Sequence, residues 1–290
     1  MNKNTLIKHI VERLSAAEID YPEKIGASKE AGRDKRQIEA GVLIPLLFET
    51  NRSANSNEPV FILSKRSTAV SQSGDLSGPG GELKPFLDHF LRSLIVHGFP
   101  PLLGGAALIH ARERGKAAFD SIALFLANAV RESWEEIRLN PFNIRFLGPL
   151  PPYRLRLLAK TIFPMVGLIE KKWEFNSSRE VEKLVEIPLE AFYNKENYSF
   201  FSIRLQDNMT DGTACGWKSP CLIFENTTGE VETLWGATFN IIMSFLDIVF
   251  DFTPPDIHPE KIITKTLNTD YLTGNDRRRP KFLDKFRQDR

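Results

Sequence analysis

Residues 129–137 read Ala-Val-Arg-Glu-Ser-Trp-Glu-Glu-Ile. Glu132, Glu135 and Glu136 are three and four positions apart, a spacing that places all three carboxylates on the same face of an α-helix. Like charges on one face repel each other, so the pattern by itself does not stabilise a helix. A hard divalent cation binds carboxylate oxygens and would remove this repulsion. The stretch therefore predicts a Mg²⁺-binding helix face, and a solvent-exposed structural helix is the alternative interpretation.

A helix from Ser121 to about Leu139 is predicted around this stretch, with Asp120 as its N-cap and Asn140-Pro141 at its end. The carboxylates then lie in its C-terminal half, where the helix dipole disfavours negative charge. A turn-rich loop, Gly78-Pro79-Gly80-Gly81, lies about fifty residues upstream, and its glycines allow the backbone to approach a ligand closely. Both features favour a bound ligand over a bare helix.

The composition is that of an ordinary globular protein, with 42% hydrophobic and 26% charged residues, which is enough apolar material for a packed core. The net charge of +1 gives no global attraction to nucleic acid or membrane. Cys215 and Cys221 are too few for a disulfide framework or a zinc site, and we expect both to be reduced. Residues 1–13 do not resemble a signal peptide, and no apolar stretch approaches a membrane span. The sequence thus predicts a cytoplasmic protein.

Hydrophobic periodicity predicts alternating strands and helices along the rest of the chain. We expect an amphipathic helix over residues 4–19, and a buried strand over 39–49 that lies at a sheet edge or bulge because Pro45 cannot donate a ladder hydrogen bond. Further strands are expected at 60–64, 144–150, 161–170, 181–188, 200–205 and 220–224, and a core helix at 234–250. The predicted units are an N-terminal helical extension (1–37), a central domain (38–252, with an insertion at about 82–119) and a C-terminal tail (253–290).

The glycine loop followed by Arg131-Glu132 and Glu135-Glu136 resembles the Nudix box, the motif of a family of Mg²⁺-dependent pyrophosphohydrolases. Flanking pieces resemble, in the correct order, the coenzyme A pyrophosphatase-like branch of that family: residues 40–48, 63–67 with Gly74, 147–150 with 163–167, 180–189 and 235–238. The resemblance covers about residues 38–250. It implies an α/β fold, a Nudix-type α/β/α sandwich with a mixed β-sheet, here with an N-terminal helix and an insertion inside the box.

The resemblance also implies an enzyme that hydrolyses the diphosphate linkage in coenzyme A or a related nucleoside diphosphate derivative, with Mg²⁺ as cofactor and Mn²⁺ as its substitute. The expected partner is a small-molecule nucleotide substrate, without nucleic acid or membrane, and homodimer formation is left open. The implied site residues are the metal ligands Glu132, Glu135 and Glu136, the orienting Arg131, the loop residues Gly80 and Gly81, the phosphate contacts Lys65 and Arg66, and a fourth carboxylate, Glu180 or Glu182, as ligand or general base. For Lys65, Arg66 and the fourth carboxylate, an ordinary exposed charge is the alternative.

The chain departs from the family pattern at several positions. Ser71 lies where the branch has an arginine, and Ser133 and Arg138 replace an apolar residue and a glycine of the box. Ala123 lies where the family has a glutamate, eight residues before the box arginine. The role of that glutamate then passes to Asp120, Glu113 or Glu82, or is absent. These departures and the insertion favour two alternatives: a Nudix hydrolase of a nucleotide sugar or dinucleotide, and a catalytically degenerate domain that binds a nucleotide.

Overall fold

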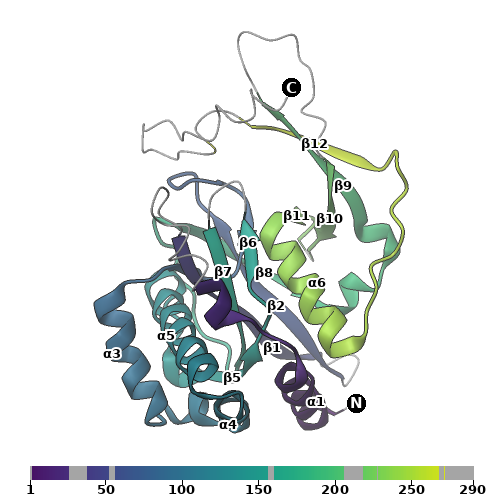
Figure 1. The fold of residues 1–290 in the computed structure, drawn as a ribbon. Coiled ribbons are helices and arrows are strands. Elements are labelled where there is room, and N and C mark those ends of the chain that lie inside the picture. Colours follow the sequence, from purple (N-terminus) through teal and green to yellow (C-terminus); the bar gives the residue numbers. More distant parts are fainter. Residues whose placement is uncertain are drawn as a thin grey trace.

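A computed structural model describes residues 2–25, 38–51, 56–155, 160–205, 218–226, 228–267 and 271. These residues form mixed β-sheets with helices packed against them, which confirms the predicted α/β class (Figure 1). The α-helices are α1 (Lys3–Ala16), α3 (Pro85–Val96), α4 (Ala106–Glu113), α5 (Lys116–Ile137) and α6 (Gly236–Phe250). The 3-10 turns are η1 (Pro101–Gly104), η2 (Pro141–Asn143), η3 (Leu189–Phe192) and η4 (Lys195–Asn197). Across the described ranges, none of the helices combines the length and the hydropathy needed to cross a bilayer.

The larger sheet contains eight described strands, and its short strand β4 includes Gly80 and Gly81 of the glycine loop. Its strands are β1 (Ile38–Asn51), β2 (Ser56–Arg66), β3 (Leu76–Ser77), β4 (Gly80–Glu82), β5 (Ile144–Pro149), β6 (Tyr153–Leu155), β7 (Lys160–Ile169) and β8 (Val181–Pro188). The central path runs β3-β2-β1-β7-β5, while β4 pairs with β1, β6 with β7 and β8 with β2. Only β1 and β7 run parallel among these described pairs, so the sheet is mixed as predicted.

Strand β1 is central, so the edge position predicted from Pro45 is wrong. On one side β1 pairs with β7 over residues 38–47, and on the other it pairs with β4 at residues 40–42 and with β2 at 46–51. The N–H of Leu43 donates to the carbonyl of Pro79 on that second side. Residues two apart present their N–H groups to the same side of a strand, so the missing N–H of Pro45 faces the break between β4 and β2. The proline therefore removes no ladder hydrogen bond.

Helices α5 and α6 cover opposite faces of the larger sheet. Gly41 of β1 approaches Phe125 and Asn128 of α5, whereas Leu46 of β1 is paired with Phe61, whose ring packs edge-on against Phe245 of α6 at 5.6 Å. Positions 41 and 46 are an odd number of residues apart, so their side chains point to opposite faces. This is the helix–sheet–helix layering that the predicted sandwich requires.

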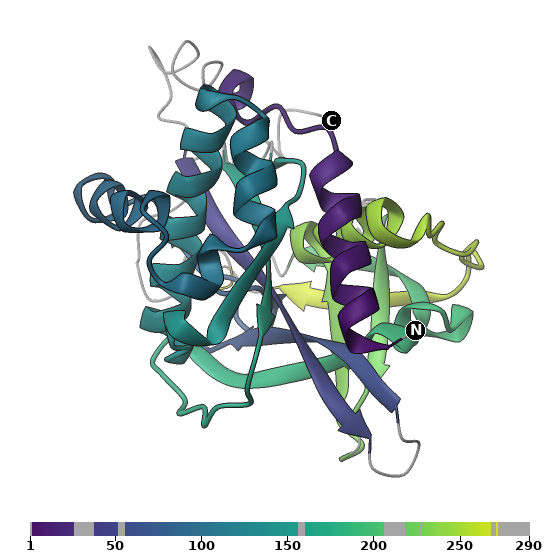
Figure 2. The same ribbon diagram turned by 90° about the horizontal axis from the view of Figure 1, so that it is seen from below.

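Helix α1 forms where the sequence places an amphipathic helix. Asn2 caps it by accepting from the Thr5 N–H, and its inward residues are Leu6, Ile7, Ile10, Val11 and Leu14. The helix packs against β5, α4 and α6, so it closes one end of the layers (Figure 2). Tyr21, just after it, is fully buried, and its ring packs edge-on against Phe125 and Phe163, which stack on each other.

A second sheet lies beyond α6, which the sequence does not predict as a separate layer. Its order is β11-β10-β9-β12, with β9 Tyr198–Leu205, β10 Lys218–Glu225, β11 Val231–Trp235 and β12 Ile262–Leu267. Strand β12 comes from the segment expected to be a tail, and residues 272–290 lie outside the described residues. Buried Glu232 of β11 joins the two sheets through ion pairs with Lys65 of β2 and Lys183 of β8.

The helix that carries the carboxylates begins earlier than predicted. It starts at Lys116 after Gly115, which has φ +92°, so Asp120 lies within the helix and pairs with Arg92 of α3 instead of capping it. The predicted insertion consists of α3, η1, α4 and the first residues of α5. This segment therefore extends α5 at its N-terminal end and packs α3 along its side.

We predict that Gly41→Ala destabilises the protein by about 2 kcal/mol, because overpacking a close contact costs roughly 1–3 kcal/mol. A Cβ at Gly41 would lie 2.6 Å from both the Phe125 carbonyl oxygen and Asn128 Oδ1, and the helix backbone cannot yield as a flexible side chain would. The measurement is the urea midpoint and slope. Gly104→Ala is the control, because its Cβ would lie 3.4 Å from the nearest atom, and a change of more than about 0.5 kcal/mol there would be unexpected. An unchanged midpoint for Gly41→Ala would contradict the close packing of α5 on β1.

Candidate active site

A cavity of about 520 Å³ gathers most of the predicted acidic residues. It lies between the C-terminal half of α5, the end of β4 and the loop before β8. Its lining residues are Glu82, Leu83, Lys84, Glu132, Glu135, Glu136, Ser178, Arg179 and Glu180. Helix α5 therefore presents all three box carboxylates to one concave site, together with the fourth carboxylate predicted at Glu180. Glu182 of β8 is exposed and does not line this cavity.

The buried Arg131 side chain connects Glu132 and Glu135 of α5 to helix α3. Its side chain is only 4% exposed, and Nη1 lies 2.8 Å from Glu132 Oε1 and 2.9 Å from Glu135 Oε2. The bidentate partner is Asp88 of α3, with Nε to Oδ1 at 2.7 Å and Nη2 to Oδ2 at 3.2 Å. Arg131 thus pairs with Glu132 and Glu135, as predicted, but its bidentate and stronger interaction is with Asp88. The sequence did not single out Asp88.

The Asp88 carboxylate accepts hydrogen bonds from three residues, Arg131, Lys84 and Asn128. It is fully buried, and Oδ2 also accepts from the Lys84 N–H at 2.7 Å and from Asn128 Nδ2 at 3.0 Å. Asn128 in turn accepts from the Gly41 N–H at 2.6 Å, which ties this network to β1. The carboxylate that forms the bidentate pair with Arg131 is therefore supplied by α3, since position 123 of α5 is an alanine.

The three residues considered for that role have other positions. Asp120 pairs with Arg92, and Glu113 contacts His110 Nδ1 at 2.9 Å. Glu82 offers Arg131 its carbonyl oxygen, at 3.2 Å from Nη2, while its side chain is exposed. The sequence did hold a signal for Asp88, because this acid lies on the same helical face as Leu91 and Ile95, where an apolar residue is expected.

We predict that Asp88→Leu lowers the free energy of unfolding by about 3–5 kcal/mol, because it leaves the buried charge of Arg131 without its main partner. The double variant Asp88→Leu with Arg131→Met should lose less than the single variant, since the unpaired charge is gone. Urea unfolding of both variants and of Arg131→Met alone completes the cycle. Additive losses would contradict a coupled pair.

The glycine loop touches two of the box carboxylates. A Cβ on Gly81 would lie 2.6 Å from Glu132 Oε1, so the Glu132 carboxylate would have to shift if another residue replaced this glycine. The Gly80 N–H donates a hydrogen bond to Glu136. Burial raises the pKa of Glu136 to about 8, the negative charges of Glu132 and Glu180 add to the rise, and Arg66 and the Gly80 N–H oppose it. Burial also raises the pKa of Glu132, against the attraction of Arg131. The site therefore concentrates negative charge that lacks full compensation.

The raised pKa of Glu136 predicts that the metal-free protein loses stability as the pH rises from about 4.5 to about 8. In this interval the folded state binds a proton that the unfolded glutamate, with its ordinary pKa near 4.5, has released, so stability falls with increasing pH. Urea unfolding in a chelator should show a steeper fall for the wild type than for Glu136→Gln. Equal slopes would show that Glu136 ionises normally; exposed Glu260→Gln is the control variant.

The two predicted phosphate contacts have different surroundings. Arg66 interacts electrostatically with Glu136, and its Nε donates to the Ser71 carbonyl at 2.8 Å, so it lies beside the carboxylates. Lys65 instead pairs with buried Glu232 at 2.9 Å. Lys160 at the start of β7 is a further cation near Glu82, Glu132 and Glu136; burial lowers its pKa and these carboxylates oppose the decrease. The sequence did not indicate Lys160, because strand position alone does not reveal which side chains it faces.

Two departures from the box have local explanations. Ser133 is fully buried, and its hydroxyl donates to the Ala129 carbonyl at 2.7 Å, so the polar group in the core is satisfied. Arg138 adopts φ +54°, the left-handed conformation that favours glycine after a helix, and its guanidinium lies 5.8 Å from the Trp134 ring centroid. Both substitutions keep the path of the chain at the end of α5.

The donor set fits a hard divalent cation, because the cavity is lined by carboxylates and Mg²⁺ prefers oxygen ligands. Among the residues that the structure describes, no group of three or more His, Cys, Asp or Glu side chains is arranged to hold a metal ion as it stands. Arg131 and Lys84 account for this, because Glu132 and Glu135 point their oxygens at these cations. The chemistry of the donor set thus suits the ion, although these carboxylates do not converge on one point in this arrangement.

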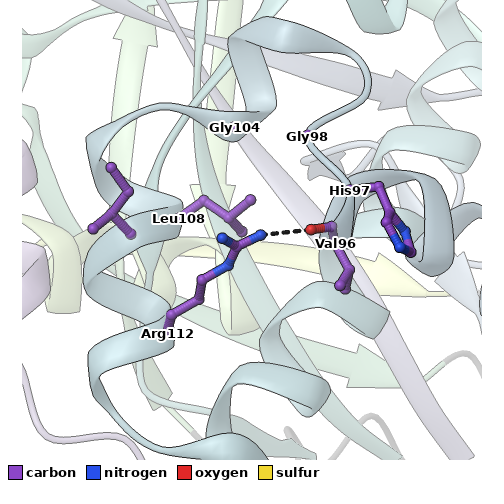
Figure 3. A pocket seen from close by; sticks show the side chains of 7 residues that line it. Val96, His97, Gly98, Gly104, Leu108 and Arg112 are labelled. Carbon is purple, nitrogen blue, oxygen red and sulfur yellow. Dashed lines mark hydrogen bonds between the residues drawn. The ribbon is translucent and has the colours of Figure 1, made fainter.

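A separate cavity of about 360 Å³ lies within the insertion (Figure 3). It is lined by Val96, His97, Gly98, Gly104, Leu108, Ile109 and Arg112. The Arg112 guanidinium donates to the Val96 carbonyl and stacks near Phe119, so its charge is already engaged. This cavity contains none of the predicted site residues, and the carboxylate cavity remains the candidate site.

The sequence is similar to that of a curated Nudix protein. Over 85 residues the chain is 33% identical to the protein named Uncharacterized Nudix hydrolase NudL from Pectobacterium atrosepticum, a match that covers 29% of this chain and 44% of the relative. The match supports the Nudix superfamily. The chain thus spans less than half of the length of this Nudix relative, and no family model matches it.

Solved Nudix structures resemble the chain only weakly. An Ap4A hydrolase of C. elegans is 14% identical with a TM-score of 0.31, over 53% of this chain and 81% of that one. A MutT/nudix family protein of Enterococcus faecalis is 11% identical with a TM-score of 0.39, over 87% and 75%. The NUDIX domain of Shewanella oneidensis NrtR, solved with ADP ribose, is 13% identical with a TM-score of 0.31, over 57% and 83%. At such low scores, these likenesses carry no argument about chemistry.

Proposed function

We propose that the protein is a Nudix-type hydrolase that cleaves the diphosphate linkage of a nucleoside diphosphate derivative with the help of Mg²⁺, or of Mn²⁺ in its place. One observation carries this proposal: Glu132, Glu135, Glu136 and Glu180 line a single cavity beside the Gly80-Gly81 loop. A carboxylate cluster of this kind suits a divalent cation and, through it, a diphosphate.

Each residue has a defined part in this function. Glu132, Glu135 and Glu136 would hold Mg²⁺, which supplies positive charge that neutralises the diphosphate and activates water. Arg131 orients Glu132 and Glu135, and Asp88 fixes Arg131. Glu180 serves as a further ligand or as the general base.

Cations next to the carboxylates would bind the substrate. Arg66 lies close enough to Glu136 to interact electrostatically with it, and a guanidinium matches the geometry of a phosphate. Lys160 faces the same carboxylates. Lys65 is the weaker candidate, because Glu232 already compensates its charge. The cavity loop adds Gly80 and Gly81, whose backbone allows a close approach.

Coenzyme A is the substrate that the flanking sequence favours, because the pieces from residues 40 to 238 resemble the coenzyme A pyrophosphatase-like branch. Ser71 in place of the branch arginine favours a nucleotide sugar or a dinucleotide instead. A panel of coenzyme A, NADH, ADP-ribose and nucleotide sugars, assayed with and without Mg²⁺, separates these substrates. Tight nucleotide binding without turnover would instead support the catalytically degenerate alternative.

We predict that Glu135→Gln and Glu136→Gln each lower turnover by about two orders of magnitude or more, because each removes negative charge that holds the cation. Glu132→Gln should behave similarly. The measurement is Mg²⁺-dependent product release on the best substrate of the panel, with folding checked by urea unfolding. Glu260→Gln, an exposed glutamate away from the cavity, should keep full activity. Full activity of the Glu135 and Glu136 variants would overturn the proposed function.

A further inference from the structure

We propose that Asp75 is a positioning residue for substrate binding, which fixes the loop after Arg66 by gripping side chains from the C-terminal part of the chain. The inference rests on the proposed function, in which Arg66 contacts a substrate phosphate. Asp75 itself does not line the carboxylate cavity, so it acts through the loop of residues 66–75.

The half-buried Asp75 carboxylate accepts hydrogen bonds from three side chains that lie much later in the sequence. Its side chain is only 13% exposed. Oδ2 accepts a hydrogen bond from the Tyr271 hydroxyl, and Oδ1 accepts from Trp235 Nε1 at 3.1 Å and from Lys265 Nζ at 3.4 Å. The three donors come from the end of β11, from β12 and from the residue described beyond it. A carboxylate held by donors of this kind has one preferred position, because these hydrogen bonds would be lost if the carboxylate moved.

Hydrogen bonds within the loop of residues 66–75 connect the position of Asp75 to the orientation of Arg66. The Arg66 N–H donates to the Asp75 carbonyl at 2.9 Å, and the Gly74 N–H donates to the Arg66 carbonyl at 2.9 Å. The Arg66 guanidinium is turned by its Nε bond to the Ser71 carbonyl within the same loop. Gln72, which has φ +57°, donates its N–H to the Tyr271 carbonyl, so Tyr271 holds the loop at a second point.

The same loop borders the fourth carboxylate. The Ser67 N–H donates to the Glu180 carbonyl at 2.9 Å, and the Ser67 hydroxyl donates to the Arg179 carbonyl. Arg179 and Glu180 both line the carboxylate cavity. A shift of the loop would therefore disturb the substrate-binding side of the cavity, whereas Glu132, Glu135 and Glu136 on α5 would keep their places.

The test is a comparison of Asp75→Asn and Tyr271→Phe with Tyr198→Phe. Tyr198 is a buried tyrosine whose hydroxyl donates to the Phe192 carbonyl at 2.7 Å, so the control removes a similar hydrogen bond away from the loop. We expect Asp75→Asn to raise KM about tenfold and to change kcat less than about twofold, since binding and not chemistry is affected. Tyr271→Phe should act in the same direction more weakly. The Mg²⁺ concentration for half-maximal activity should stay unchanged.

Several results would overturn the inference. An Asp75→Asn enzyme with wild-type KM would do so, as would a KM increase of the same size in Tyr198→Phe, which would reveal a general loss of stability. Amide hydrogen exchange gives a readout that does not need activity. The amides of Arg66, Ser67 and Gly74 should exchange faster in Asp75→Asn but not in Tyr198→Phe. Unchanged exchange in Asp75→Asn would contradict the inference that Asp75 fixes this loop. If the wild type hydrolyses nothing on the substrate panel, the proposed function fails, while the exchange result still decides whether Asp75 holds the loop.

Discussion

The arrangement of the candidate site depends on the buried guanidinium of Arg131, whose positive charge needs partners in the protein interior. Arg131 has to be compensated because its side chain is almost completely removed from water, and an uncompensated buried charge costs several kcal/mol. Asp88 meets that need with two parallel hydrogen bonds and is itself held by Asn128 and the Lys84 N–H. Glu132 and Glu135 then accept from the remaining nitrogen. The direction of the carboxylates on α5 is thus set by an acid from a different helix.

This requirement explains the unusual orientation of α3. Its inward residues include the acid Asp88, while Phe86 is 92% exposed and Phe90 is 57% exposed. An ordinary surface helix turns its apolar side inward. Here the charge of Arg131 determines which side of the helix faces α5, and the aromatic residues are left outside. The inward face of α3 therefore combines the Asp88–Arg131 ion pair with the burial of Ile95.

Sequence reasoning predicted the parts of the site that are local in the chain. The spacing of Glu132, Glu135 and Glu136 predicted their shared helix face, and the glycine loop was expected beside it. Asp88 and Lys160 were missed because their roles arise from contacts between residues far apart in the sequence. The edge position of Pro45 was wrong because a proline nitrogen can also face a break between two partner strands. The second sheet was missed because β12 reaches β9 across an intervening helix.

The long separation between Asp75 and its partner Tyr271 has a consequence for biosynthesis. The two residues are 196 positions apart, and Lys265, another partner, is 190 positions away. Domains emerge from the ribosome N-terminal end first, at a rate of about 5–20 residues per second. Strand β2, which ends at Arg66, is therefore made many seconds before Lys265 and Tyr271. A nascent chain would pass through a stage in which α5 is already made but the loop of residues 66–75 still lacks its contacts with Lys265 and Tyr271. Under the proposed function, this loop would reach its final position only after Tyr271 has been made.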